Sequence, residues 1–459
     1  MRYTALATAA GFGVLLFMNI IPVQVFGGLV AFGTVVLRVL SFSFIPAMFT
    51  LVKVEKIEKA AVDEDASSRW ASQSLRRLAG CGVRRPGTTA LIGVIFLAAA
   101  IFGTAKIVVN NNMVEWFKKG SAIRQADSVI NKALGGTSLA YIVAVSEEDG
   151  YIKTPEAMRY IEGLQKRLER LPIVGKTNSV ADYVKRINLV LHDNDPAFDA
   201  VPDGKETIGQ YLFLFSMSAK PSDVDNVVDY PFRKANIWVQ LKSWDAGAMR
   251  EVIDAVDGYK KTNPGRLVFK PSGIAYFNLV WNDEVLWDML KGFIIALIAV
   301  FAILSLNFHS IRWAVVGYTP LLFTILLIYG AVGFIGKDFD MPIAVLSCLS
   351  LGMAVDFAIH FISRLKERMR EAGSEGGKDG LTEALLWTAA RPGKGIMRNA
   401  ILFASAFSVM LLAPLTPYIT VGAFIVSMMT LSALFTIIAL PALIVLLRAW
   451  LFKNRKTEA

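Results

Sequence analysis

Long apolar stretches with almost no charge recur along the chain and set its architecture. A helix needs about 20 residues to cross the ~30 Å hydrocarbon core of a bilayer. On this basis we predict eight membrane segments, at Tyr3–Met18, Val25–Leu51, Gly87–Val109, Trp287–Phe308, Trp313–Ile335, Pro342–Ile362, Ala400–Leu412 and Tyr418–Leu447. The pattern is that of a polytopic α-helical membrane protein with about eight transmembrane helices.

Residues 110–286 are different, because their charges and periodicity are those of a folded soluble domain. Leu139–Val145 and Ala235–Leu241 are β-rich and apolar, and Leu267–Lys270 predicts a shorter strand. Helical spacing covers four further segments, namely Pro155–Leu171, Ala181–Leu191, Lys205–Met217 and Ala246–Tyr259. Alternating strands and helices of this size predict an α+β sandwich of split βαβ type.

The Lys and Arg residues of the short loops predict the orientation, because cytoplasmic loops carry the excess of positive charge. Three basic segments, 53–86, 364–398 and 449–459, fall on one side when eight spans are threaded through a membrane. We therefore expect them in the cytoplasm and the soluble domain on the outer, periplasmic side of a bacterial inner membrane. The domains expected are two membrane helices (1–52), a basic linker (53–86), a membrane helix (87–109), a porter-like α+β domain (110–286), a five-helix bundle (287–448) and a cytoplasmic tail (449–459).

The net positive charge of the chain belongs to the predicted membrane part. The chain has 459 residues, 54% hydrophobic and 19% charged, a mean hydropathy of +0.48 and a net charge of +10. Residues 110–286 hold 22 basic and 23 acidic residues, so about +11 belongs to the rest of the chain. This basicity fits membrane topology and contact with anionic lipids. A nucleic-acid partner is not indicated, since no basic patch with interleaved aromatics is present.

Catalytic signals are missing from the sequence. Cys81 and Cys348 lie far apart and predict no disulfide framework or metal site. His192 lies beside Asp193 and Asp195 on a polar loop without metal-ligand spacing, which favours a solvated turn. Without a nucleophile–base pair or phosphate loop, an enzyme is the least favoured class.

The two ends of the chain resemble each other at a constant offset of 395 residues. Gly27 matches Gly422, Pro46 matches Pro441, and Lys53 matches Arg448. A constant offset through a whole hairpin indicates an internal repeat, although two apolar hairpins can also share Pro and Gly by chance. If the repeat is real, only the last two helices of its first unit are present, and roughly 300 residues would complete that unit. We then expect a missing first repeat, supplied by an upstream polypeptide or by self-association.

A carboxyl group lies well inside the sixth predicted span. Asp356 is about two helical turns from Arg364 and is too short to reach the membrane surface, so it must face protein or a water-filled path. A carboxyl group in such a place can exchange a proton near neutral pH. Gly352, one turn earlier on the same face, lets a neighbouring helix approach, and His360, one turn later, could pass protons inward.

Structural roles remain open for each of these residues. Asp356 could tie helices together by a hydrogen bond, and His360 could simply lie at the interface beside Arg364. Ser405 and Ser408, in the seventh predicted span, could supply hydrogen bonds to Asp356, but Ser is common in membrane helices. We keep all four as candidate site residues, together with Gly352 and Phe357.

The motif Gly352-x-x-x-Asp356-Phe357-x-x-His360 resembles the resistance-nodulation-division (RND) superfamily. The turn 338–342 and the closing Leu440-Pro441-Ala442 are also similar, and the closest branch is that of MMPL-like and hopanoid lipid transporters. The resemblance implies twelve helices in two repeats, of which this chain covers the fifth to the twelfth, and two periplasmic porter domains. It also implies a proton gradient and no cofactor, with Asp356 as the second-repeat proton relay.

Two departures from the family matter. Many MMPL-like members have Tyr where this chain has Phe357, so a phenolic hydrogen bond is lost, and the matching first-repeat helix is absent. The leading hypothesis is part of a proton-driven exporter of lipids or other hydrophobic substrates. A non-transporting, sterol-sensing-like receptor or scaffold, and an inactive truncated fragment, are the alternatives.

Overall fold

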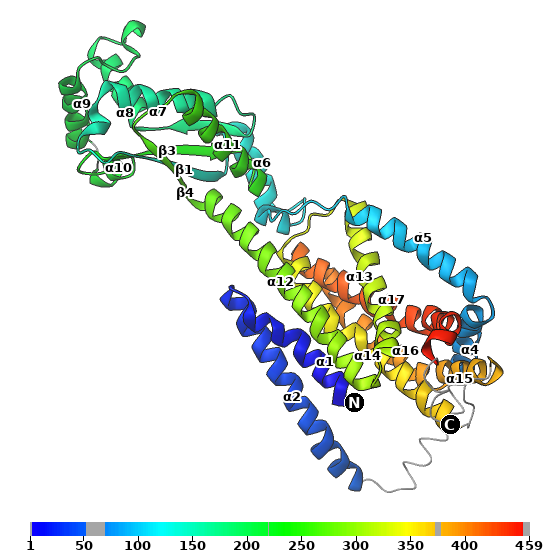
Figure 1. Cartoon of the computed structure of the whole chain (residues 1–459). Helices are drawn as coiled ribbons and strands as arrows, with labels where there is room; N and C mark the ends of the chain where they lie inside the picture. The colour runs from blue at the N-terminus through cyan, green and yellow to red at the C-terminus, as the bar shows by residue number, and fades with distance from the viewer. Residues whose placement is uncertain (1, 52–68, 219, 372–377, 453–459) are drawn as a thin grey trace. The chain divides into compact units, whose positions relative to one another are not determined.

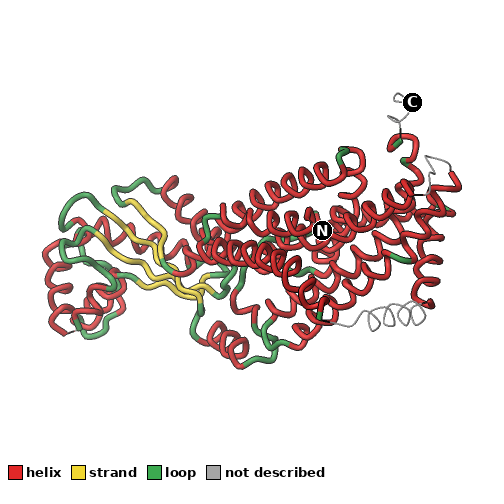
Figure 2. Tube along the Cα trace, turned by 90° about the horizontal axis from the view of Figure 1, so that it is seen from below, coloured by secondary structure: helices red, strands yellow, loops and turns green. Residues whose placement is uncertain are grey.

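The computed structural model of the chain describes residues 2–51, 69–218, 220–371 and 378–452. It is mostly helical, with one small sheet (Figure 1; Figure 2). Two compact units divide the chain: residues 1–109 with 285–459, and residues 110–284. We call the first the membrane unit and the second the sheet unit.

The sheet unit is built on four strands, β1 (Ser138–Val145), β2 (Val174–Asn178), β3 (Lys234–Leu241) and β4 (Val268–Ser272). Their order is β2-β3-β1-β4, and each neighbouring pair is antiparallel. Strands β1 and β2 are therefore parallel and separated by β3, which is the split βαβ arrangement predicted from the sequence. Strand β2 was not predicted, because its polar Lys176-Thr177-Asn178 masks the β pattern.

Capping residues mark the start of several helices of the sheet unit. They are α6 (Ala122–Ala133), α7 (Pro155–Leu168), α8 (Val180–Leu191), α9 (Lys205–Ser218), α10 (Pro221–Asp225) and α11 (Ala246–Thr262). Thr154 accepts a hydrogen bond from the amide of Ala157, and Pro155 occupies the first helical position, which suits proline. The helices predicted at Pro155, Ala181, Lys205 and Ala246 are confirmed. Their buried faces pack with the inner faces of β1 and β3 to form one apolar core.

The membrane unit contains long apolar helices, and the chain is a polytopic helical membrane protein. All the helical segments of this unit, long and short, are α1 (Arg2–Gly13), η1 (Val14–Phe17), α2 (Ile21–Thr50), α4 (Arg69–Arg84), α5 (Pro86–Thr104), α12 (Ile274–Phe308), α13 (Ile311–Ile335), α14 (Met341–Glu371), α15 (Lys378–Ala390), α16 (Pro392–Ser408), η5 (Val409–Leu412), α17 (Thr416–Leu446) and α18 (Arg448–Leu451), among the residues that the structure describes. Six described helical segments are long and apolar enough to cross a membrane, and Thr4–Phe17 is a shorter apolar one. The first predicted span falls on that shorter segment, and the sixth falls on α14.

Several helices extend beyond the spans predicted on them. Helix α12 begins at Ile274 rather than Trp287, because Asp283, Glu284 and Asp288 lower the hydropathy without breaking the helix. The span predicted from Ala400 belongs to a helix that begins at Pro392. The basic linker 53–86 contains helix α4, whose buried Leu75, Ala79 and Val83 at four-residue spacing were the overlooked signal. Residues 52–68 of that linker and 453–459 of the tail lie outside the described residues.

The 395-residue offset extends to the backbone itself. Helix α1, η1 and α2 form a hairpin, and α16, η5 and α17 form a second one, with η1 and η5 offset by 395 residues at both ends. In the first hairpin, a Cβ at Gly27 would clash with Leu15 Cβ and Phe12 O. In the second, a Cβ at Gly422 would lie 2.8 Å from Met410 Cβ and 2.9 Å from Phe407 O. Each contact partner is again offset by 395, so the same glycine allows the same close crossing twice.

Candidate functional site: a carboxyl group inside the membrane unit

Helix α14 lies among the other helices of the membrane unit. It contacts α1, α13, α15, α16 and α17, and Figure 1 shows it within the bundle. Its described side chains are buried on several faces, at Leu351, Val355, Phe357, Ala358, Ile359, Phe361, Ile362 and Leu365. A polar side chain in this stretch is therefore surrounded by protein rather than by lipid.

Asp356 lies in the middle of this buried stretch. Its Oδ1 is buried, and no hydrogen-bond partner reaches that atom from the described part of the chain. An ionised carboxylate without a partner is costly in such surroundings, whereas a protonated one is much less so. The arrangement is therefore one in which gain and loss of a proton can change the packing around α14.

Gly352, one turn before Asp356, is the point where α1 meets α14. The Thr8 hydroxyl donates a hydrogen bond to the Gly352 carbonyl at 3.1 Å, and it also lies 3.1 Å from the Thr4 carbonyl. A Cβ at position 352 would lie 3.0 Å from Thr8 Cα, which is tighter than ordinary packing. The glycine therefore brings the backbone of α1 next to the turn that carries the carboxyl group.

His360 and Phe357 follow on the same helix. His360 is half-buried one turn after Asp356, and Arg364, one turn further, pairs with Glu367 at 2.6 Å. Phe357 is 1% exposed and is among the largest fully buried side chains. The helix thus places Gly352, Asp356 and His360 at successive turns on one face, ending at an exposed ion pair.

Ser405 and Ser408 are placed differently from the other candidates. Both lie near the end of α16, where Ser405 is exposed and the Ser408 hydroxyl donates to the Ser405 carbonyl at 2.7 Å. That hydroxyl is thus engaged within its own helix. The geometry gives no reason to group these two residues with Asp356.

Buried hydroxyl groups on neighbouring helices escaped the sequence analysis. Thr324 of α13 and Ser432 and Thr436 of α17 are fully buried, and both helices contact α14. Thr324 donates to the Pro320 carbonyl at 2.7 Å, whereas Thr436 Oγ1 has no hydrogen-bond partner within the described residues. The four-residue spacing of Ser432 and Thr436, on one face of an apolar helix, was the available signal.

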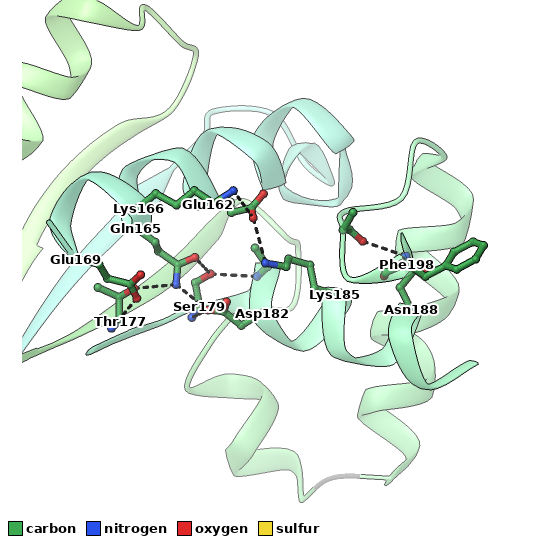
Figure 3. Close-up of polar contacts among 12 residues, drawn as sticks. Glu162, Gln165, Lys166, Glu169, Thr177, Ser179, Asp182, Lys185, Asn188 and Phe198 are labelled. Carbon is green, nitrogen blue, oxygen red and sulfur yellow. Dashed lines mark hydrogen bonds and ion pairs between the residues drawn. The ribbon is translucent and has the colours of Figure 1, made fainter. Parts of the chain in front are cut away.

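The sheet unit has a buried polar cluster whose bonds are structural (Figure 3). Gln165 of α7 accepts from the Ser179 hydroxyl at 2.7 Å and donates to Asp182 at 2.6 Å, which joins α7 to the start of α8. Ser179 and Asp182 also form the capping box of α8. This cluster positions two helices and leaves no open group for chemistry.

An ion pair at the edge of this cluster joins the same two helices. Lys185 and Lys166 donate to Glu162 at 3.0 Å and 2.9 Å. Burial works against the charged carboxylate, but these two hydrogen bonds outweigh it and lower the pKa of Glu162. Burial likewise opposes the charge of Lys185, and the bond to Glu162 raises the pKa of Lys185. The pair thus stabilises the contact between α7 and α8.

The loop at His192 carries no metal geometry. The His192 ring stacks on Phe198 with centroids 3.7 Å apart, and Asp195 accepts from the amide of Ala197. Among the described residues, no group of three or more His, Cys, Asp or Glu side chains is placed to hold a metal ion. The loop is a capped turn.

The profile of the MMPL family matches residues 117–459, which is most of the chain. The chain belongs to the MMPL family. This confirms the resemblance to the RND superfamily noted from the motif at Asp356. No curated protein sequence matches the chain.

A solved structure shares the fold. It is the cryo-EM structure of the hedgehog release protein Disp from the water bear Hypsibius dujardini, with a TM-score of 0.57 and 14% sequence identity. The match covers 96% of this chain and 57% of the Disp chain, so this chain spans little more than half the length of that protein. At this identity the comparison establishes the fold and nothing further.

Proposed function

We propose that this chain is part of a proton-driven RND-type exporter that moves lipids or other hydrophobic molecules out of or across the cytoplasmic membrane. Membership of the MMPL family supports a transport role. The observation that carries the proposal is the buried, unpartnered Oδ1 of Asp356 on a helix enclosed by its neighbours. No enzymatic step forms part of the proposal.

In this proposal Asp356 takes up a proton from one side of the membrane and releases it towards the other. Protonation removes the charge that disfavours close packing of α14, and deprotonation restores it. Because α1 rests on Gly352, a change in the position of α14 is passed directly to α1. His360, one turn further along, is the proposed next carrier, since an imidazole can accept a proton on one ring nitrogen and release one from the other.

The proposed location is the bacterial inner membrane, with eight spans and with residues 110–286 in the periplasm. The concentration of Lys and Arg in 53–86, 364–398 and 449–459 supports this orientation. In a background without native cysteines, Ser74→Cys should resist an impermeant external thiol reagent in intact cells, and Asp203→Cys should react. Labelling of Ser74→Cys alone would reverse the proposed orientation.

We also propose that transport requires a second repeat, as an upstream polypeptide or a second copy of the chain. The offset between the two hairpins supports this. Photo-crosslinking amino acids introduced at exposed positions of α2, such as Leu29 and Val36, should capture such a partner in membranes, because they insert into C–H bonds of protein and lipid alike. Capture of lipid alone, at every α2 position, would argue against a protein partner.

The decisive experiment replaces the carboxyl group without changing its shape. Asp356→Asn keeps most hydrogen bonding but cannot exchange a proton, so export by the complete transporter should be lost while the protein stays folded and inserted. A structural role predicts the opposite order, with Asn tolerated and Asp356→Ala damaging by about 1–3 kcal/mol through an unsatisfied partner. The export rates of both variants are compared at matched membrane abundance. An export rate of the Asp356→Asn variant equal to that of the wild type between pH 6 and 8 would end the relay proposal.

The second candidate is a non-transporting, sterol-sensing-like receptor or scaffold. The fully buried Phe357 favours it, because no phenolic hydroxyl is available next to Asp356 to carry a proton or a hydrogen bond. Phe357→Tyr separates the two candidates. Faster export would favour the transporter, whereas loss of stability from a buried hydroxyl, with no export by either form, would favour the scaffold.

A further inference from the structure

Four arginine side chains gather on one face of α4 and at the start of α5. Arg76, Arg77, Arg84 and Arg85 line a cavity of about 760 Å³, which Leu386 of α15 closes on one side and to which Cys81 contributes its thiol. The function proposed above uses none of these residues. All of them lie within the membrane unit.

The helix is built so that these arginines stay on the outside. Arg77, Cys81 and Arg84 recur at spacings of three and four residues, which places them on one face. The opposite face is buried, through Leu75, Ala79 and Val83, and packs on α15 and α17. At Gly82, a Cβ would clash with the Ile438 carbonyl of α17, so α4 is fixed on its support.

The residues that the structure describes compensate only part of the positive charge in the cavity. Arg76 is held by Glu383 of α15, with both carboxylate oxygens at 3.0 Å. The structure gives the side chains of Arg77, Arg84 and Arg85 no ion pair with any described residue. Like charges held this close together repel one another, so an anion that enters the cavity is stabilised.

The cavity also lies beside an exposed apolar helix. Arg85 is the N-cap of α5, which is long and apolar enough to cross a membrane and whose most apolar stretch is only 11% buried. Trp70, two turns before Arg77 on the same face, is 79% exposed, and Trp favours the membrane–water interface. If α5 crosses a membrane, its N-cap Arg85 lies at the depth of the phospholipid phosphates.

We infer that this cavity binds the phosphate of an anionic phospholipid, such as phosphatidylglycerol. Arginine suits the task because its planar guanidinium donates two parallel hydrogen bonds to phosphate oxygens. The side chains of Arg77, Arg84 and Arg85 contact the phosphate, and Leu386 contacts the glycerol and the first methylenes. A bound lipid would bridge α4 and α15 and stabilise the contact between them.

Cys81 provides a local reporter, because its exposed thiol lies in the cavity wall. In a Cys348→Ser background, full-length protein in detergent is treated with a maleimide in the presence of short-chain phosphatidylglycerol, phosphatidylcholine, glycerol phosphate or inorganic phosphate. Phosphatidylglycerol should slow alkylation of Cys81 several-fold, and phosphatidylcholine should not. Equal protection by inorganic phosphate or glycerol phosphate would show that the ligand is a soluble phosphate and not a phospholipid.

A double variant and a matched control test whether the cavity arginines cause the protection of Cys81. Arg77→Gln/Arg84→Gln should raise the phosphatidylglycerol concentration for half protection about tenfold, since each basic residue contributes to lipid attraction. Arg368→Gln/Arg370→Gln, which removes the same charge elsewhere in the membrane unit, should leave protection unchanged. The ratio of rates with and without lipid, taken within each variant, cancels any effect of the arginines on thiol reactivity.

Gly80→Leu tests the cavity while keeping every charge. A Cβ at Gly80 would be in ordinary contact with Leu386, at 3.9 Å, and Gly80 lines the cavity, so a larger side chain occupies part of the space that the lipid needs. Protection by phosphatidylglycerol should be lost in this variant too. Full protection in Gly80→Leu, or equal losses in the pocket and control arginine pairs, would overturn the inference in favour of diffuse surface attraction.

Discussion

The two hairpins related by the 395-residue offset have the same local form and opposite surroundings. Both place a short 3₁₀ segment before a long helix with an internal proline, Pro46 in α2 and Pro441 in α17. In α17, 50% of the most apolar stretch is buried inside the protein. In α2, only 6% of the corresponding stretch is buried. The hairpin is therefore set by its own residues, while burial is set by the neighbours that the rest of the chain provides.

Equivalent positions make the contrast measurable. Phe424, Ile437 and Leu440 of α17 are buried, whereas their counterparts Leu29, Phe42 and Ile45 of α2 are exposed. Arg38 of α2, whose guanidinium lies 3.7 Å over the Phe42 ring, corresponds to the fully buried Ala433. Pairs of substitutions at these positions change the same chemistry in two environments.

The largest expected effect is at the arginine position. Ala433→Arg puts an unpaired charge into a packed helix interface and should prevent stable folding, at a cost above about 4 kcal/mol. Arg38→Ala should leave the chain as stable as before or ease its insertion by about 2–3 kcal/mol, because a mid-helix Arg is costly in a bilayer. Chemical unfolding in mixed micelles measures both. A destabilising Arg38→Ala would mean that this arginine already has a protein partner.

A smaller contrast comes from truncating an apolar side chain. Leu440→Ala should cost about 2–5 kcal/mol through a cavity in the core of the membrane unit. Ile45→Ala should change stability by less than about 0.5 kcal/mol, because that side chain is already about half exposed and its removal leaves no enclosed cavity. The same unfolding assay compares them, and similar losses for both would show that α2 is covered under the conditions of the measurement.

The crossing glycines should show no contrast. Gly27→Ala and Gly422→Ala each force a Cβ against atoms of the same hairpin, at a cost of about 1–3 kcal/mol. Because the clashing atoms are internal to each hairpin, the two losses should agree within about 0.5 kcal/mol. Thermal unfolding in detergent provides the comparison, and a loss confined to Gly422→Ala would show that the exposed hairpin yields where the packed one cannot.

The smallest expected effect is the pH dependence of the ion pair between Glu162 and Lys185 in the sheet unit. The lowered pKa of Glu162 means that its stabilisation is present above its ordinary value of ~4.3 and is lost as the pH falls through the lowered one. The raised pKa of Lys185 means that its stabilisation is present below ~10.4 and is lost as the pH rises beyond. The free energy of opening of α7 and α8 in the full chain, measured by hydrogen exchange and corrected for the pH dependence of intrinsic exchange, should therefore vary by no more than about 1 kcal/mol between pH 5 and 9. A steeper change in that range would contradict the pair's role.

Much of the architecture could be predicted from the sequence, because long apolar runs and capping residues act locally. The helix that starts at Pro155, the hairpin glycines and the split βαβ order are examples. Helix α4 could not be recognised so readily, since its arginines hide the apolar face that packs on α17. For the candidate site, the sequence located the turn with Gly352 and Asp356, but only packing reveals that Thr8 is the contact of Gly352 and that Ser408 is occupied by its own helix.

Under the proposed function, the carboxyl group at Asp356 also limits the free energy that is available for each transport cycle. If it carries one proton per cycle, a membrane potential of ~150 mV supplies roughly 3.5 kcal/mol for each cycle. Moving one lipid chain of ~16 carbons into water costs on the order of 12 kcal/mol, at about 0.8 kcal/mol per methylene. One proton cannot drive that transfer. A lipid carried by this machinery must therefore pass from one apolar surface to another without its chain ever becoming hydrated.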